Sequence, residues 1–375
     1  MAHRHHLGTP AGTVEEAAAA LVGLHSSDPA TVFLSAWARI EGFSVADLEK
    51  ALYDDRTLVR IPGMRRTLFV VPRETAPTIA RACTSRYAKT ERARLARMLE
   101  EQSVAEDGFA WIETAGRDVL RALEAGPATA TALSKRIPEL TRKLTFGEGK
   151  KWGGQFGVST RVLFVMTAEG RIVRGRPLGS WLSGQYRWEA TGAPAISRDE
   201  EPDALARRDL VMAWLESFGP ATLTDVKWWT GWTLRESRRA IADAGAVEVA
   251  LDDRPGYALA DDLEDTDDPG DWVALLPSLD PTVMGWKDRE WYLGTHGDAL
   301  FDRNGNAGPT VWHNGELIGG WAQRQGGEVV WKLLTDPGAA ANSRIAERAA
   351  ELTDWLDGTV ATPRFQSPLG AELSA

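Results

Sequence analysis

The chain has 375 residues, a formal net charge of −10 and 43% apolar residues, enough for two or three compact cores. No apolar run approaches the roughly 20 residues that span a bilayer, and the N-terminus lacks the apolar stretch of a signal peptide. The single cysteine, Cys83, excludes an internal disulfide and a thiolate-rich zinc site. We therefore expect a folded cytoplasmic protein with no membrane partner.

The charge is unevenly distributed along the chain. Residues 1–180 carry 26 basic and 20 acidic side chains, whereas the remainder carries 17 and 33. The bias is largest over residues 60–97, where ten basic side chains are accompanied only by Glu74 and Glu91. Such a segment can neutralise several phosphates, although a solvated helix face would have the same composition.

The first predicted elements are three helices and a strand. Thr13 is placed to cap a helix over residues 14–24, and Asp28, followed by proline, begins a second helix. Ser44 begins a third, and the β-branched and aromatic residues of 66–72 predict a strand. Helices followed by a basic hairpin are typical of a winged helix.

Two later segments repeat one pattern, the first beginning at Val119 and the second at Val211. In each, an apolar helix ends at Gly-Pro, a threonine caps a second helix, and a third helix follows at residues 159–168 or 233–244. A glycine and a β-rich stretch come next. This is the order of a helix-turn-helix with its wing, so the chain is predicted to hold three tandem winged-helix units.

The C-terminal part begins after the acidic linker of residues 261–271. Alternating apolar residues over 310–334, with Asn314-Gly315 as a two-residue turn, predict a small antiparallel sheet. A helix over residues 339–356 and a disordered polar tail are expected to follow.

The predicted fold class is therefore α+β, with three tandem winged-helix units and a small C-terminal antiparallel β subdomain. The expected boundaries are 1–110 for the first unit and its following helices, 111–195 for the second, 196–262 for the third, and 263–375 for the β subdomain and terminal helix.

The sequence contains no complete metal-binding motif. The segment from Asp302 begins like a calcium loop, but His313 stands where a bidentate glutamate is needed, so we predict an Asx-rich turn. The six histidines lack the spacing of zinc ligands, and His3, His5 and His6 are expected in a mobile terminus. We expect neither a metal nor another cofactor.

Three stretches carry a family resemblance: LVGLHSSDPATVFLSAWARIEGF, ALYDDRTLVRIPGMRRTLFVVP, and LLPSLDPTVMGWKDREWYL with FDRNGNAGPTVWHNGELIGGWAQR. Over residues 14–357 the chain resembles the bacterial winged helix DNA-binding domain superfamily that contains the AlkZ and YcaQ type DNA glycosylases. The resemblance implies winged helices that form a concave channel for double-stranded DNA. It also implies hydrolysis of the N-glycosidic bond to alkylated or crosslinked purines. We expect a monomer, because the sequence shows no effector domain beside these units.

The family's active motif is Gln-x-Gln or Gln-x-Asp, whereas the matching positions here hold His25-Ser26-Ser27, followed by Asp28. The candidate catalytic residues are His25 as a base or donor, Asp28 as a stabiliser of positive charge, and Ser27, whose hydroxyl is too short to replace a glutamine. Alternatively, Ser27 and Asp28 cap a helix, and His25 satisfies a neighbouring carbonyl.

The family resemblance also suggests phosphate contacts on or before the presumed wing of the first unit and around the third helix of the second. The candidate DNA-binding residues are Arg60, Arg65, Arg66, Lys150, Lys151 and Arg161. Exposed charge without a partner is the alternative. Trp152 and Trp181 border glycines in basic loops and are weaker candidates for stacking on an unpaired base, whereas Trp37 is expected in the core.

Three functions remain open. The first is a DNA glycosylase that repairs alkylated DNA or protects its host from a DNA-alkylating natural product. The second is a non-catalytic DNA-binding protein, such as a regulator or a damage-recognition module. Substituting His25 and Asp28 abolishes base excision in the first case and leaves DNA binding intact in both. The third is a scaffold that binds protein through the acidic C-terminal half and has no salt-dependent affinity for DNA.

Overall fold

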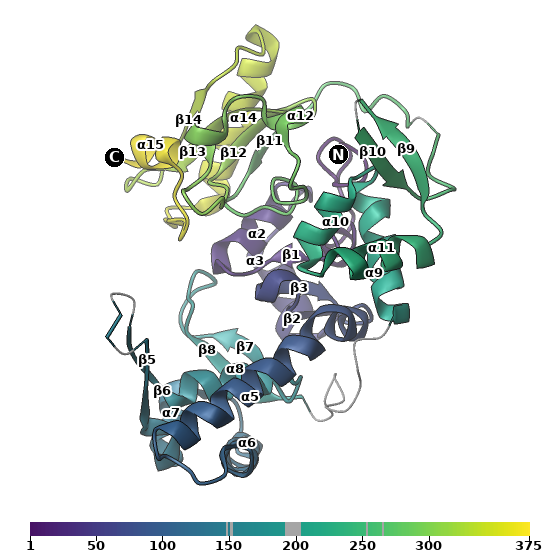
Figure 1. Ribbon diagram of the computed structural model, residues 1–375. Helices are drawn as coiled ribbons and strands as arrows, with labels where there is room; N and C mark the ends of the chain where they lie inside the picture. Colours follow the sequence, from purple (N-terminus) through teal and green to yellow (C-terminus); the bar gives the residue numbers. More distant parts are fainter. Residues whose placement is uncertain (148, 151–152, 192–203, 253, 265) are drawn as a thin grey trace. The chain divides into compact units, whose positions relative to one another are not determined.

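The computed structural model describes residues 1–147, 149–150, 153–191, 204–252, 254–264 and 266–375 (Figure 1). Contacts divide the chain into two compact units, which are treated separately below. Unit 1 comprises residues 1–59, 67–72 and 208–375, and unit 2 comprises residues 60–66 and 73–207. Each unit contains both helices and strands, which confirms the predicted α+β class. No helix within these described ranges is long and apolar enough to cross a membrane.

The first helix of unit 1 is shorter than predicted. Helix α1 (Val14–Ala19) is capped by the Thr13 hydroxyl, which accepts a hydrogen bond from the Glu16 N–H. The backbone then takes positive φ values at Val22 (53°) and Gly23 (117°). These positive φ values end α1 and direct the chain into a short strand. At Gly23 a positive φ carries no steric cost, because glycine has no Cβ.

A small three-stranded sheet follows α1, with the order β1-β3-β2. Its strands are β1 (Leu24–His25), β2 (Leu58–Pro62) and β3 (Leu68–Pro72). Strand β1 pairs with β3 in antiparallel fashion. The helical elements between β1 and β2 are α2 (Pro29–Trp37), α3 (Val45–Glu49) and the π-helical turn η1 (Lys50–Asp54). The predicted caps at Asp28 and Ser44 and the predicted strand are confirmed.

The middle of unit 1 has the element order predicted for the third winged helix. Its elements are α9 (Ala204–Phe218), which begins at the end of unit 2, α10 (Leu223–Thr230), α11 (Leu234–Asp243), β9 (Val247–Leu251) and β10 (Arg254–Ala258). Thr222 and Asp225 form a reciprocal capping box on α10, and Thr233 and Glu236 form another on α11. These local hydrogen bonds explain why the sequence marked both helix starts.

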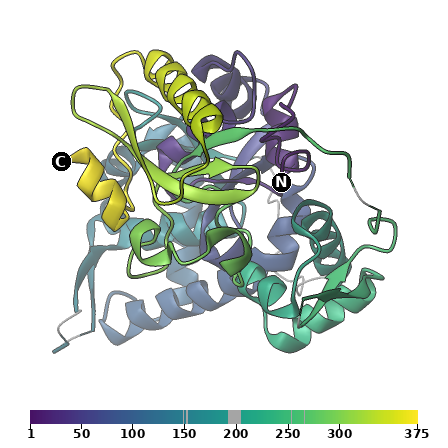
Figure 2. The ribbon, with the colours of Figure 1, turned by 90° about the horizontal axis from the view of Figure 1, so that it is seen from above.

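The C-terminal sheet has the order β11-β12-β13-β14, and α14 lies across it (Figure 2). Its elements are β11 (Val273–Leu276), α12 (Glu290–Leu293), α13 (Gly297–Leu300), β12 (Thr310–His313), β13 (Glu316–Gln323), β14 (Val329–Leu333) and α14 (Ala339–Leu356). Asn314 and Gly315 have φ values of 47° and 89°, as a tight hairpin turn requires, and Asp302 accepts the N–H groups of Asn304 and Asn306, as predicted for an Asx-rich turn.

The expectation of a disordered tail was wrong. Residues 368–374 form α15 (Pro368–Ser374), which packs against β13 and β14. The Ser367 hydroxyl caps this helix by accepting the Gly370 N–H, and the side chain of Leu369 is buried. The cap and the buried leucine thus help to order a segment that is polar in composition.

The main apolar core of unit 2 is formed chiefly by α5, α6, α7 and α8. Its helical elements are η2 (Met64–Arg66), α4 (Ala76–Ile79), η3 (Ala80–Thr84), α5 (Ser85–Glu101), α6 (Gly108–Glu124), α7 (Ala130–Arg136), η4 (Pro138–Thr141) and α8 (Val158–Ala168). Its strands are β4 (Ala128–Thr129), β5 (Lys143–Phe146), β6 (Gly154–Gly157), β7 (Ile172–Pro177) and β8 (Tyr186–Ala190). The succession α6, α7, α8, β7, β8 matches the order expected of the second winged helix. The tandem arrangement of three such units stays a prediction.

Candidate active site and nucleic-acid interface

The predicted catalytic residues lie where β1 leads into α2. His25 is on β1 directly opposite Phe69 of β3, and the two rings meet edge to face with centroids 5.2 Å apart. The Ser26 N–H continues the pairing by donating to the Leu68 carbonyl at 2.7 Å. This pairing holds the imidazole in a defined place, where His25 is only 5% exposed.

Asp28 performs the capping role that its sequence context predicts. One carboxylate oxygen accepts the Ala30 N–H at 3.2 Å, and the other accepts the Arg364 N–H at 2.8 Å. The Arg364 guanidinium also donates to the Ser27 carbonyl at 3.4 Å. Asp28 is buried, whereas Ser27 is half-buried. The structure thus brings the three candidates together and fixes a carboxylate between the start of α2 and the C-terminal segment.

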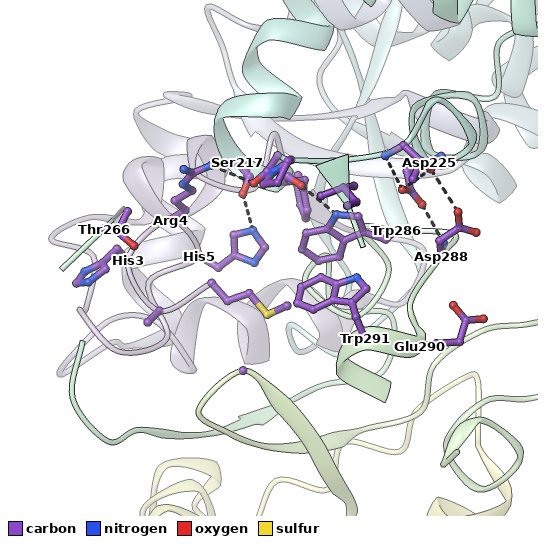
Figure 3. Close-up of a pocket in the computed structure, with 18 of the residues that line it drawn as sticks. His3, Arg4, His5, Ser217, Asp225, Thr266, Trp286, Asp288, Glu290 and Trp291 are labelled. Atoms are coloured by element: carbon purple, nitrogen blue, oxygen red, sulfur yellow. Dashed lines mark hydrogen bonds between the residues drawn. The ribbon is translucent and has the colours of Figure 1, made fainter. Parts of the chain in front are cut away.

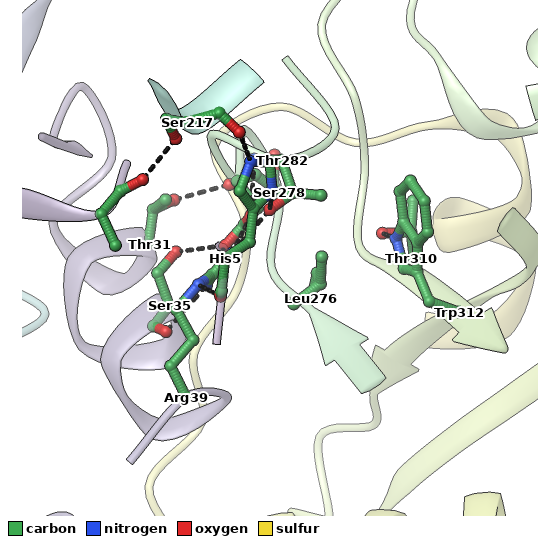
Figure 4. Close-up of polar contacts among 12 residues, drawn as sticks. His5, Thr31, Ser35, Arg39, Ser217, Leu276, Ser278, Thr282, Thr310 and Trp312 are labelled. Atoms are coloured by element: carbon green, nitrogen blue, oxygen red, sulfur yellow. Dashed lines mark hydrogen bonds and ion pairs between the residues drawn. The ribbon is translucent and has the colours of Figure 1, made fainter. Parts of the chain in front are cut away.

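A buried polar network connects α2 to residues 278–280, which precede α12 in the chain (Figure 4). The Arg39 guanidinium, just past the end of α2, donates to both oxygens of Asp280 at 2.7 and 2.8 Å, and both side chains are fully buried. The Ser35 hydroxyl donates to the same carboxylate at 2.6 Å, and Thr31 donates to the Ser278 carbonyl at 2.7 Å. The helix that begins at Asp28 is therefore anchored along its length to residues 278–280.

The expectation that His5 lies in a mobile terminus was wrong. Its ring is fully buried, with Nε2 3.0 Å from the Ser217 carbonyl and Nδ1 3.0 Å from the Thr282 hydroxyl. Because a carbonyl only accepts, Nε2 carries the hydrogen and Nδ1 accepts from Thr282. The Arg39 guanidinium donates to the His5 carbonyl at 2.9 Å. Burial, followed by the positive charges of the α-amino group and Arg39, holds the pKa of His5 well below 6.5.

This lowered pKa predicts acid sensitivity. Since the unfolded chain binds a proton near pH 6.5 and the folded chain does not, stability is fully present above that pH and falls below it. We expect a loss of up to about 1.4 kcal/mol per pH unit from this one group. Urea unfolding of the parent and of His5→Gln at several pH values measures it. A steep parent slope that survives in His5→Gln would contradict the assignment.

The basic run of unit 2 contains a cluster of three arginines around one acid. Arg66 of η2, Arg94 of α5 and Arg161 of α8 lie 3.3, 4.0 and 3.9 Å from the Glu91 carboxylate. The side chain of Glu91 is only 9% exposed, whereas those of the arginines are 38–58% exposed. The fold thus brings Arg66 and Arg161, two predicted phosphate contacts, together with Arg94, a further member of the basic run.

Another member of the basic run, Arg92, forms ion pairs inside unit 2. Arg92 pairs with Glu113 at 3.1 Å and with Glu169 at 2.8 Å, and Arg171 pairs with the same two acids. The side chains of Arg92 and Arg171 are mostly buried. This four-membered network ties α5, α6 and the end of α8 together, so its arginines support the fold of unit 2.

The remaining predicted DNA contacts are dispersed. Arg60 is 3% exposed and lies over the Tyr186 ring, 4.7 Å from its centroid. Arg65 is half-buried and has a positive φ of 51°, and Lys150 is exposed between β5 and β6. Lys151 and Trp152 lie outside the described residues. Trp181 is half-buried, and Trp37 is buried beneath the Arg348 guanidinium, as expected of a core residue.

The chain combines an α+β fold, in which three helices are followed by a hairpin, with an exposed arginine cluster. These features are typical of the class of nucleic-acid-binding proteins. The family model described as "AlkZ-like: DNA glycosylase AlkZ-like" matches residues 18–355. The chain therefore belongs to the AlkZ-like DNA glycosylase family, which confirms the predicted resemblance.

A solved structure supports the same fold. The Streptomyces sahachiroi DNA glycosylase AlkZ is similar, with a TM-score of 0.70 and 18% sequence identity over 94% of each chain. A search of curated proteins gave no match. At this level of identity the likeness establishes the fold alone.

Proposed function

We propose that the protein is a cytoplasmic, monomeric DNA glycosylase that hydrolyses the N-glycosidic bond of N7-alkylated or crosslinked purines in double-stranded DNA. The observation that carries the proposal is the family match over residues 18–355, and the likeness of fold to AlkZ supports it. The proposal includes three tandem winged helices around a concave DNA-binding channel, with boundaries at 1–110, 111–195 and 196–262. Residues 263–375 form the bracing subdomain.

The protein does not need to activate the leaving group, because the alkylated base already carries a positive charge. An N7-alkylated purine carries a positive charge, and breaking its bond to C1′ returns the electron pair to the base, which departs neutral. Water then adds to the electron-deficient sugar carbon and loses a proton. The protein must position that water, receive the proton and stabilise the positively charged sugar.

Under this proposal, His25 receives the proton from water, and the negative charge of Asp28 stabilises the cationic sugar. Both Asp28 oxygens accept backbone N–H groups, which fix the carboxylate in position. The half-buried Ser27 is the most accessible of the three and contributes a hydroxyl to water placement. His25 and Asp28 together take over the role of the family's glutamines, because the Ser27 hydroxyl is too short to do so.

The test is release of the modified base from duplex DNA carrying 7-methylguanine or a bulkier N7-alkylguanine. Release above the spontaneous rate is the expected result. The replacement of both family glutamines favours a second candidate function, a non-catalytic DNA-binding protein. Tight, salt-sensitive binding without release from either lesion would establish that function instead.

We propose that Arg66 and Arg161 bind backbone phosphates. Replacing either with alanine is expected to weaken binding to all duplex sequences alike, because phosphate contacts carry no sequence information. Each lost contact should lower the slope of log affinity against log salt by about 0.9. Fluorescence anisotropy over a salt series measures this slope.

Arg324→Ala is the matched control, because it removes an equally exposed arginine that pairs with Glu328 beside the C-terminal sheet. It should leave the slope unchanged. Equal slopes for the parent, Arg66→Ala and Arg161→Ala would refute the phosphate contacts. An affinity for DNA that does not respond to salt in any of these proteins would favour the scaffold function.

A further inference from the structure

Unit 1 contains a cavity of about 950 Å³ that the proposed chemistry does not use. Its walls come from the N-terminal residues 1–5, the turn after α9, the β9–β10 hairpin, the segment 266–272, the loop that leads into α12, and the β12–β13 turn. The volume lies at the upper end of the range that holds small organic ligands.

Two tryptophans dominate one wall of the cavity (Figure 3). Trp286 is 5% exposed, and its indole N–H donates to the Phe218 carbonyl at 2.9 Å, which fixes the ring. Trp291 stands edge-on to it with centroids 5.2 Å apart, yet is 59% exposed. Leaving so much indole surface in water at the mouth of a cavity is unfavourable, so this ring is suited to cover a ligand.

Negative charge surrounds these rings. The charged side chains that line the cavity, besides two histidines, are Asp225, Asp252, Asp288, Glu290, Arg4 and Arg254. Both guanidinium groups are already paired, Arg4 with Asp262 at 2.5 Å and Arg254 with Asp288 at 3.4 Å.

The carboxylates that line the cavity differ in how many of their interactions are already satisfied. Asp225 accepts the N–H groups of Lys287 and Asp288. Within the described ranges, Asp252 and Glu290 have no ion-pair partner. The α-amino group of Met1 also lines the cavity, and burial followed by the charge of Arg4 lowers its pKa. The site is therefore poor in available positive charge and rich in carboxylate, which disfavours an anionic ligand.

We propose that this cavity binds a planar organic cation, stacked on Trp291 and neutralised by Glu290. Indole faces attract cations through their quadrupole, and Glu290, which also lines the cavity, adds a counter-charge. The neighbouring Trp286 holds Trp291 in place by edge-to-face contact. The proposal does not rest on the glycosylase activity, because His25 and Asp28 do not line the cavity.

The test compares N-methylacridinium with acridine, a neutral molecule of the same shape at slightly alkaline pH. Calorimetric titration into the full chain, freed of nucleic acid because acridinium intercalates, should give at least about tenfold tighter binding of the cation. Trp291→Ala is expected to weaken both ligands about tenfold, whereas Glu290→Gln weakens only the cation.

Two controls keep the outcome specific. Phe109→Ala removes another exposed aromatic side chain, which lies on α6 of unit 2, and should leave both affinities unchanged. Trp291→Ala should retain base release, so failure of the cavity proposal and failure of the glycosylase proposal are distinguishable. Equal binding of acridine and its cation, or unchanged binding by Trp291→Ala, would overturn the proposal.

Discussion

Replacing Arg39 with methionine is expected to lower the free energy of unfolding by about 3–5 kcal/mol. The variant leaves the fully buried Asp280 carboxylate without the guanidinium that contacts both its oxygens. The remaining donors, Ser35 and the Thr282 N–H, satisfy it only in part and carry no charge. Urea unfolding followed by tryptophan fluorescence measures the loss.

Two further variants decide whether the buried pair is the cause. Removing both charges in Arg39→Met with Asp280→Leu should recover a large part of the loss, because no uncompensated charge then remains. Arg324→Met breaks an exposed pair of similar chemistry and should cost less than about 1 kcal/mol. A loss of similar size in Arg39→Met and Arg324→Met would contradict the importance of burial.

The second large effect is catalytic. His25→Ala is expected to slow base release by about 10²–10⁴-fold, the usual contribution of a positioned general base, while DNA affinity stays near that of the parent. Single-turnover release from a duplex containing 7-methylguanine measures the chemical step separately from binding. His296→Ala, which removes a histidine bonded to Thr335, is the matched control and should release base at the parent rate.

Testing Asp28 requires a substitution that removes its negative charge but keeps its hydrogen bond to the start of α2. Asparagine caps helices about as well as aspartate, so Asp28→Asn removes the charge and keeps α2 capped, whereas Asp28→Ala removes both. We expect slow release from Asp28→Asn, with a smaller loss of stability than in Asp28→Ala, because asparagine keeps the cap and loses only the acceptor of the Arg364 N–H. If release by His25→Ala and Asp28→Asn equals that of the parent, the β1–α2 junction is not the catalytic site.

Much of the fold could be predicted because its determinants are local. Asp28, Thr129 and Thr222 each accept an N–H two or three residues further on, so the sequence alone marks these helix starts. The same holds for Asn314-Gly315, whose turn conformation depends on those two residues. Family membership followed from similarly contiguous stretches, and these also placed His25, Ser27 and Asp28 together.

What only the tertiary structure decided involves partners far apart in the chain. Arg39 and Asp280 are separated by 241 residues, and His5 is 277 residues from Thr282. Nothing near either residue in sequence distinguishes it from a solvated one. For the same reason, the sequence did not reveal the arginine cluster around Glu91 or the 950 Å³ cavity, whose lining residues come from distant segments. Burial and charge pairing depend on which side chains the folded chain brings together, and short-range patterns carry no information about that.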